Sequence, residues 1–183
     1  MGRDISSTSY SREHRQRYRE KVRQCLDVFE QMLTSTRFAF GDRMTGMEIE
    51  LNLVDRDYRP KMDNADVLAA IADPEYQTEL AQFNIEFNVA PRTLGGDELA
   101  TLERQLRLSL NAAERKCAER GTHIMMIGIL PTVMPETFEG NWMSQGARYI
   151  ALNDAMLAAR GEDIHLDIRG PSGERLNRYA DSL

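Results

Sequence analysis

Two short segments alternate between apolar and polar residues, and they constrain the fold more than any other feature of this sequence. The segments are Met44–Val54 and Phe83–Val89. A period of two predicts β-strands with one buried face, because successive side chains of a strand point to opposite sides. The polar side of each strand carries acids and amides, which are Glu48, Glu50, Asn52, Asn84, Glu86 and Asn88.

Amphipathic helices account for much of the remaining chain. Apolar residues recur at steps of three and four, which is the helical period. This pattern predicts a helix from Ser11 to about Thr34, a short one through Val67–Ile71, a long one over Asp97–Arg120 and another over Ala147–Arg160. Strands combined with helices of this kind indicate an α+β fold, in which helices pack on one face of a mainly antiparallel sheet.

The remaining element boundaries are predicted from prolines and from runs of apolar residues. Pro91 is expected to end the second strand, and the apolar run His123–Leu130 indicates a strand buried on both faces. A length of 183 residues predicts a single domain. We divide it into an N-terminal helix within 1–36, a sheet with covering helices at 44–168, and a polar tail at 170–183, where the chain is expected to stop within a larger structure.

Composition narrows the classes of function. The net charge of −6 disfavours nucleic acid as a partner. A signal peptide or membrane-spanning run is not predicted, so we expect a cytoplasmic protein without a membrane partner. Cys25 and Cys117 lack the neighbouring ligands of a zinc site and are expected to be buried or idle thiols rather than a disulfide. A homo-oligomer is left open.

The polar sides of the two strands suggest chemistry if the strands pair. Glu48, Glu50 and Glu86 would then gather on one sheet face, where like charges repel unless a cation or solvent separates them. Mg²⁺ binds carboxylate oxygens and commonly completes its shell with substrate phosphates. Alternatively, the same residues form the wet side of an antiparallel sheet without any ligand. The pattern alone leaves both interpretations open.

Three segments resemble glutamate–cysteine ligases, within the glutamine-synthetase-like group of carboxylate–amine ligases. The first is Gly46-Met-Glu48-Ile-Glu50-Leu-Asn-Leu-Val-Asp55, similar to the family's Gly-x-Glu-x-Glu strand. The second runs from Thr78 to Pro91, with Glu79, a further acid seven residues later at Glu86, and a closing proline. The third and weaker one joins Gly128-Ile-Leu-Pro131-Thr132 to Gly146-Ala-Arg148-Tyr149.

This resemblance implies a magnesium site and an ATP-dependent reaction. Glu48, Glu50 and Glu86 would hold Mg²⁺, or Mn²⁺ in its place, with Glu79 more peripheral. ATP would phosphorylate a glutamate side-chain carboxylate, and cysteine or another amine would attack the acyl phosphate to give an amide. Arg148 and Tyr149 lie where the family contacts substrate, although an arginine on a helix is more often solvent-facing. The resemblance implies no catalytic residue apart from the metal ligands.

The resemblance also implies what a complete ligase would need in addition. The family's catalytic domain continues beyond this length and supplies a metal-binding histidine, more acidic ligands and most of the ATP pocket. We therefore expect an N-terminal portion of a glutamine-synthetase-like catalytic domain that is inactive when isolated. The competing hypothesis is a non-catalytic module that retains the sheet and binds a metal or another ligand without turnover.

Overall fold

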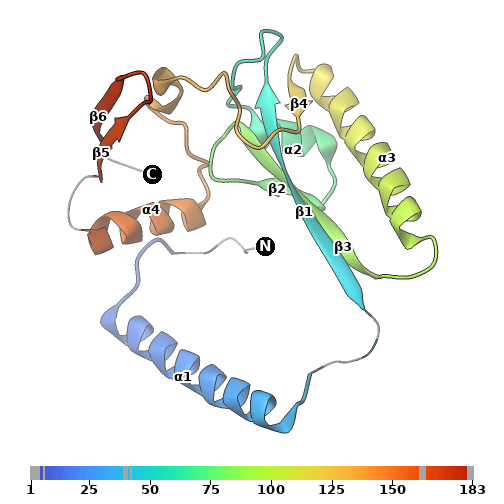
Figure 1. Ribbon diagram of the computed structural model, residues 1–183, viewed down its shortest axis with the longest axis vertical. Helices are drawn as coiled ribbons and strands as arrows, with labels where there is room; N and C mark the ends of the chain where they lie inside the picture. Colours follow the sequence, from blue (N-terminus) through green and yellow to red (C-terminus); the bar gives the residue numbers. More distant parts are fainter. Residues whose placement is uncertain (1–4, 6, 39–40, 42, 161–163, 181–183) are drawn as a thin grey trace. The chain divides into compact units, whose positions relative to one another are not determined.

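The computed structural model describes the chain apart from residues 1–4, 6, 39–40, 42, 161–163 and 181–183 (Figure 1). The chain divides into two compact units. Residues 27–144 form the first unit, and the described residues on either side of that range form the second. Helix α1 (Arg12–Ser35) crosses the boundary between them.

The first unit is built on an antiparallel four-stranded sheet. Its strands are β1 (Met44–Val54), β2 (Tyr76–Thr78), β3 (Asn84–Thr93) and β4 (His123–Met125), in the order β2-β3-β1-β4. Every neighbouring pair in the sheet is antiparallel. The expected α+β class and antiparallel sheet are thereby confirmed, with the two alternating segments as the central strands.

Two helices cover the apolar face of this sheet. They are α2 (Asn64–Ile71) and α3 (Glu98–Ala118). The apolar side chains of β1 and β3 pack against them to form the main core, whose buried members are Leu51, Leu53, Val67, Ile71, Tyr76, Ile85, Phe87, Ala113 and Cys117. Burial raises the pKa of the Cys117 thiol to about 11, so this thiol is protonated and unreactive at neutral pH.

A second apolar cluster lies at the end of β1. Its buried members are Val54, Ala81, Phe83, Leu130 and Trp142. The segment between β4 and Ser144, which contains the short 3₁₀ helix η1 (Pro135–Phe138), supplies Leu130 and Trp142. Backbone hydrogen bonds from Gln82 to Trp142 and from Ser144 to Leu80 fix this segment beside the chain that leads into β3.

Strand β3 does not end at Pro91, as the sequence predicted, but continues to Thr93. The register explains the difference. Val89 pairs with Met47 and Arg92 pairs with Thr45, so β3 contains one residue more than β1 across this step and forms a bulge. Proline is tolerated at a bulge because the ladder hydrogen bond it cannot donate is already interrupted there.

The apolar run His123–Leu130 was also predicted wrongly. Only His123–Met125 form strand β4, which lies at the edge of the sheet and pairs with the last residues of β1. Met126 and Ile127 are exposed, and Ile129 is 88% exposed. A continuous apolar run is buried only when other elements cover both faces of the strand, and here the strand ends at Met125, before the exposed residues of the run.

Helix α1 has the bounds that its periodicity predicted, but its apolar stripe is not buried. Tyr18, Leu26, Phe29 and Leu33 are all exposed. The helical period identifies which side of a helix is apolar, and it carries no information about what covers that side. Within the described residues, no helix is both long enough and apolar enough to cross a membrane.

The second unit contains a helix and a hairpin. Helix α4 (Ala147–Arg160) agrees with its predicted bounds, and strand β5 (Ile164–Arg169) comes after it in the chain. The range 170–183, expected to be a polar tail, contains strand β6 (Arg175–Ala180), which pairs with β5. The turn between them places Gly173 at φ +93°, and Arg175 Nε lies 2.7 Å from Asp167 Oδ1.

Candidate functional site

The predicted acids lie on one face of the sheet. In the antiparallel register Glu50 is directly opposite Glu86, and Glu48 is opposite Asn88. Directly opposite residues point to the same side, with Cβ atoms about 5 Å apart. The structure therefore confirms that Glu48, Glu50 and Glu86 share the face that α2 and α3 do not cover. We call the surface formed by these residues and Asn88 the acidic face.

Strand β2 adds polar groups beside Glu86. Gln77 is opposite Glu86 on the side away from β1, so it belongs to the same face. Glu79 follows two residues later, and its charge is close enough to raise the pKa of Glu86. Gln77 could not be predicted as part of this face, because a strand of three residues is too short to show alternation.

Glu86 is the most shielded acid of the acidic face. It is 7% exposed, whereas Glu48 and Glu50 are exposed. Loss of hydration raises the pKa of the Glu86 carboxyl, and the charges of Glu48 and Glu79 raise it further. Neighbouring side chains screen this carboxylate from water although it does not lie deep in the protein. Its ionised form is therefore destabilised, and a bound cation would relieve that destabilisation.

Replacing Glu86 with glutamine is expected to stabilise the metal-free chain by about 1 kcal/mol at pH 7, the scale of a like-charge contact between strands. A carboxyl whose pKa is raised by folding binds more protons in the folded state. Its cost is therefore absent below the ordinary value of 4.5 and grows as pH rises through the folded pKa.

Urea unfolding of both proteins at pH 4 and pH 7 measures this effect. The advantage of Glu86→Gln should be present at pH 7 and should shrink at pH 4. An equal advantage at both values, or a loss of stability at pH 7, would contradict the electrostatic account of Glu86.

Two of the amides on this side of the sheet have structural roles. Asn84 Nδ2 donates to Asn52 Oδ1 at 2.9 Å, and Asn52 Nδ2 donates to the Ile127 carbonyl at 2.9 Å. This chain of hydrogen bonds links β3, β1 and the segment that follows β4. Asn52 and Asn84 are directly opposite each other, so their positions follow from the same register that pairs Glu50 with Glu86.

The two proposed substrate residues lie in the second unit. Arg148 and Tyr149 are at the start of α4, where Tyr149 is buried. The Arg148 guanidinium donates from Nη2 to the Tyr149 hydroxyl at 2.6 Å, and its Cζ lies 4.6 Å from the centre of the Tyr149 ring. These contacts hold the guanidinium in a defined orientation. The acidic face belongs to the first unit.

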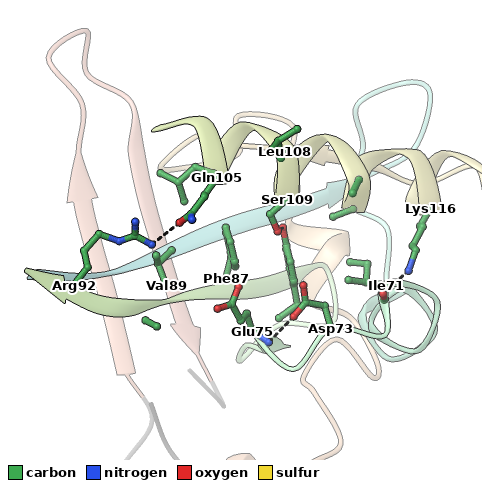
Figure 2. A pocket seen from close by; sticks show the side chains of 15 residues that line it. Ile71, Asp73, Glu75, Phe87, Val89, Arg92, Gln105, Leu108, Ser109 and Lys116 are labelled. Carbon is green, nitrogen blue, oxygen red and sulfur yellow. Dashed lines mark hydrogen bonds between the residues drawn. The ribbon is translucent and has the colours of Figure 1, made fainter. Parts of the chain in front are cut away.

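A groove of about 580 Å³ lies on the helix-covered side of the sheet (Figure 2). Its lining includes Phe87, which stacks on Tyr76 with ring centroids 4.5 Å apart. Arg92 Nη2 donates to Gln105 Oε1 at 2.6 Å within the groove. Phe87 alternates with Glu86 and Asn88 along β3, so the groove and the acidic face are on opposite sides of the sheet.

The donor atoms of the acidic face suit a hard cation, but they are not closely gathered. Carboxylate and amide oxygens are the ligands that Mg²⁺ and Mn²⁺ prefer. Among the described residues, however, no three His, Cys, Asp or Glu side chains form a group that could hold a metal ion. Other ligands, such as water or substrate oxygens, would have to complete a coordination shell here.

Comparisons of the chain with protein-family models, with curated proteins and with solved structures find no match.

Proposed function

We propose that this chain supplies the cation-binding sheet of an ATP- and Mg²⁺-dependent carboxylate–amine ligase resembling glutamate–cysteine ligase. The observation that supports this most is the register of β1 and β3, which sets Glu50 opposite Glu86 and places Glu48 on the same face. The raised pKa of Glu86 adds to it, because a buried carboxylate beside other carboxylates is typical of a site made for positive charge.

The proposed reaction requires that ATP and the glutamate carboxylate be held in position and that the negative charge of the phosphates be neutralised. It requires no protein nucleophile. Bound Mg²⁺ would screen the ATP phosphates and the developing charge of the transferred phosphoryl group. Glu48, Glu50 and Glu86 hold that positive charge against the sheet, and Glu79 adds negative charge at its edge. The glutamate carboxylate attacks the γ-phosphorus and ADP leaves. The amine then attacks the acyl carbon and phosphate leaves, which forms the amide.

Arg148 and Tyr149 are proposed to bind the acceptor acid. A guanidinium pairs well with a carboxylate because two N–H groups can donate in parallel. The hydrogen bond to Tyr149 orients the Arg148 guanidinium, a group that carries five N–H donors. Glutamate is the proposed acid, and cysteine or a related small amine is the proposed nucleophile.

The proposal is tested by measuring ADP release and amide formation with ATP, Mg²⁺, glutamate and cysteine, using the gene expressed to its natural stop codon. Turnover should require all four components and should fall at least about a hundredfold in Glu86→Gln, because misplacement by about 1 Å costs that much in phosphoryl transfer. Cation binding without any ADP release, whichever amine is supplied, would overturn the ligase assignment.

A second candidate function is a module that binds a cation or small ligand on the same sheet without turnover. The carboxylate and amide oxygens of the acidic face support it, because they suit a hard cation whether or not turnover follows. The two proposals share the acidic face and differ in chemistry. The 183-residue chain itself is expected to bind a divalent cation weakly and to release no ADP.

A further inference from the structure

Asn88 differs from the other amides on its side of the sheet. It lies on β3 directly opposite Glu48, and it is 6% exposed. Its backbone N–H donates to the Glu75 carbonyl, which fixes the residue in the sheet. Neither Oδ1 nor Nδ2 of its side chain has a hydrogen-bond partner, although both atoms are buried. Asn52 and Asn84, on the same face, are hydrogen-bonded to each other.

A buried amide without hydrogen-bond partners is energetically unfavourable. A buried polar group that loses its water without gaining a partner lowers the stability of the folded protein. Folded proteins pair nearly all such groups, so an exception calls for a physical explanation. The Glu86 carboxylate is near enough for the Asn88 amide to lower its pKa slightly, but no hydrogen bond of normal geometry joins them.

The surroundings of Asn88 indicate what would satisfy it. Its acidic neighbours Glu48 and Glu86 repel an anion and attract a cation. A bare cation satisfies Oδ1 alone, because Nδ2 can only donate. A cation that carries its own oxygen ligand satisfies both atoms, since the attached water or phosphate oxygen can accept from Nδ2. Amide oxygens are ordinary ligands of Mg²⁺ and Mn²⁺.

We propose that Asn88 is a ligand of the acidic face, whose Oδ1 coordinates a divalent cation shared with Glu48 and Glu86 while its Nδ2 donates to an oxygen bound to that cation. The inference rests on the proposed function, because it names a further residue of the same site. The cation would lie between Glu48, Asn88 and Glu86, while Glu50 is two residues farther along β1.

Stability and binding should change in opposite directions when Asn88 is removed. Leucine has nearly the same volume as asparagine and carries no polar atoms, so Asn88→Leu removes the unpartnered amide without leaving a cavity. The metal-free variant should unfold at a higher urea concentration than the parent chain. Its affinity for Mn²⁺ should fall at least about tenfold, the usual effect of losing one group from a metal site.

The experiment measures Mn²⁺ binding to the 183-residue chain by the electron paramagnetic resonance signal of free Mn²⁺, together with urea unfolding. Asn84→Leu is the matched control, since Asn84 is on the same strand and face but has a partner. It should lose stability and keep its affinity within about threefold, below the tenfold expected for a ligand. Asn88→Asp keeps an oxygen ligand, so it should bind Mn²⁺ at least as tightly as the parent.

Glu86→Gln distinguishes failure of the cation site from failure of the role proposed for Asn88. If the parent chain and Glu86→Gln bind Mn²⁺ equally, the acidic face is not a cation site and the proposed function fails. If Glu86→Gln loses binding while Asn88→Leu retains it, the cation site stands and the role of Asn88 is overturned. If Asn88→Leu does not fold, weaker binding by Asn88→Asp than by the parent chain overturns it instead.

Discussion

Replacing Leu51 with alanine is expected to lower the free energy of unfolding by about 3 kcal/mol, within the range for truncating a buried leucine. Leu51 is 0% exposed and belongs to the core between β1 and the two covering helices. It also lies next to Glu50 in the strand. Because successive residues of a strand point to opposite sides, burial of Leu51 places Glu50 on the acidic face.

Urea unfolding measures this loss, with Leu99→Ala as the matched control. Leu99 is on α3 and is 65% exposed, so its truncation should cost less than about 0.5 kcal/mol. Equal effects of the two substitutions would mean that β1 does not pack its apolar side on the helices. The placement of the acids on the opposite side would then lose its structural basis.

Replacing both Glu48 and Glu86 with glutamine is expected to weaken Mn²⁺ binding by about a hundredfold, taking roughly tenfold for each group lost from the site. Glutamine keeps the size and one oxygen of each side chain but removes both negative charges. The fold should persist, because the change relieves repulsion between these two acids. Isothermal titration calorimetry with Mn²⁺ measures the loss.

A control with the same change in net charge shows whether the effect is local. Glu103, in the second turn of α3, and Glu119, its C-cap residue, are both exposed. Glu103→Gln combined with Glu119→Gln therefore leaves the acidic face intact. This control should keep the parent affinity. If both double variants lose affinity to the same extent, the chain attracts Mn²⁺ through its overall charge, and the acidic face is ordinary wet sheet surface.

Strict alternation made the two central strands predictable. The bounds of β1 agree with the sequence pattern at both ends, and the apolar residues of β1 and β3 are those that form the core with α2 and α3. Once two such strands pair with their apolar sides on one face, their polar sides must share the other. Glu48, Glu50 and Glu86 could therefore be placed together from the sequence.

Features that depend on neighbours could not be predicted. Strand β2 has only three residues, which is too few to show alternation. The position of Gln77 beside Glu86 therefore could not be predicted. Asn52, Asn84 and Asn88 occupy equivalent positions in the alternating pattern, yet two are hydrogen-bonded and one is not. Asn84 bonds to Asn52, and Asn52 bonds to the Ile127 carbonyl, so the difference depends on partners distant in the sequence that no local pattern encodes.

Apolar patterns were misleading where cover was missing. The apolar stripe of α1 has the spacing of a buried helix face, but it is exposed. Ile127 and Ile129 lie in an apolar run as dense as that of a buried strand, and they are exposed too. Periodicity reports the side that favours burial, and burial itself requires a packing partner. The ligase chemistry depends in the same way on groups beyond the sheet, so it stays a proposal that rests on resemblance.

Paramagnetic broadening by Mn²⁺ in nuclear magnetic resonance spectra of the 183-residue chain tests the cation site most directly. At substoichiometric Mn²⁺, backbone amide signals of Glu48, Glu50, Glu86 and Asn88 should broaden first, because a bound paramagnetic ion relaxes nearby nuclei most strongly. Signals of exposed acids on α3, such as Glu103, should stay sharp. Equal broadening at Glu103 and Glu86, or none at Glu86, would contradict a cation site on the acidic face.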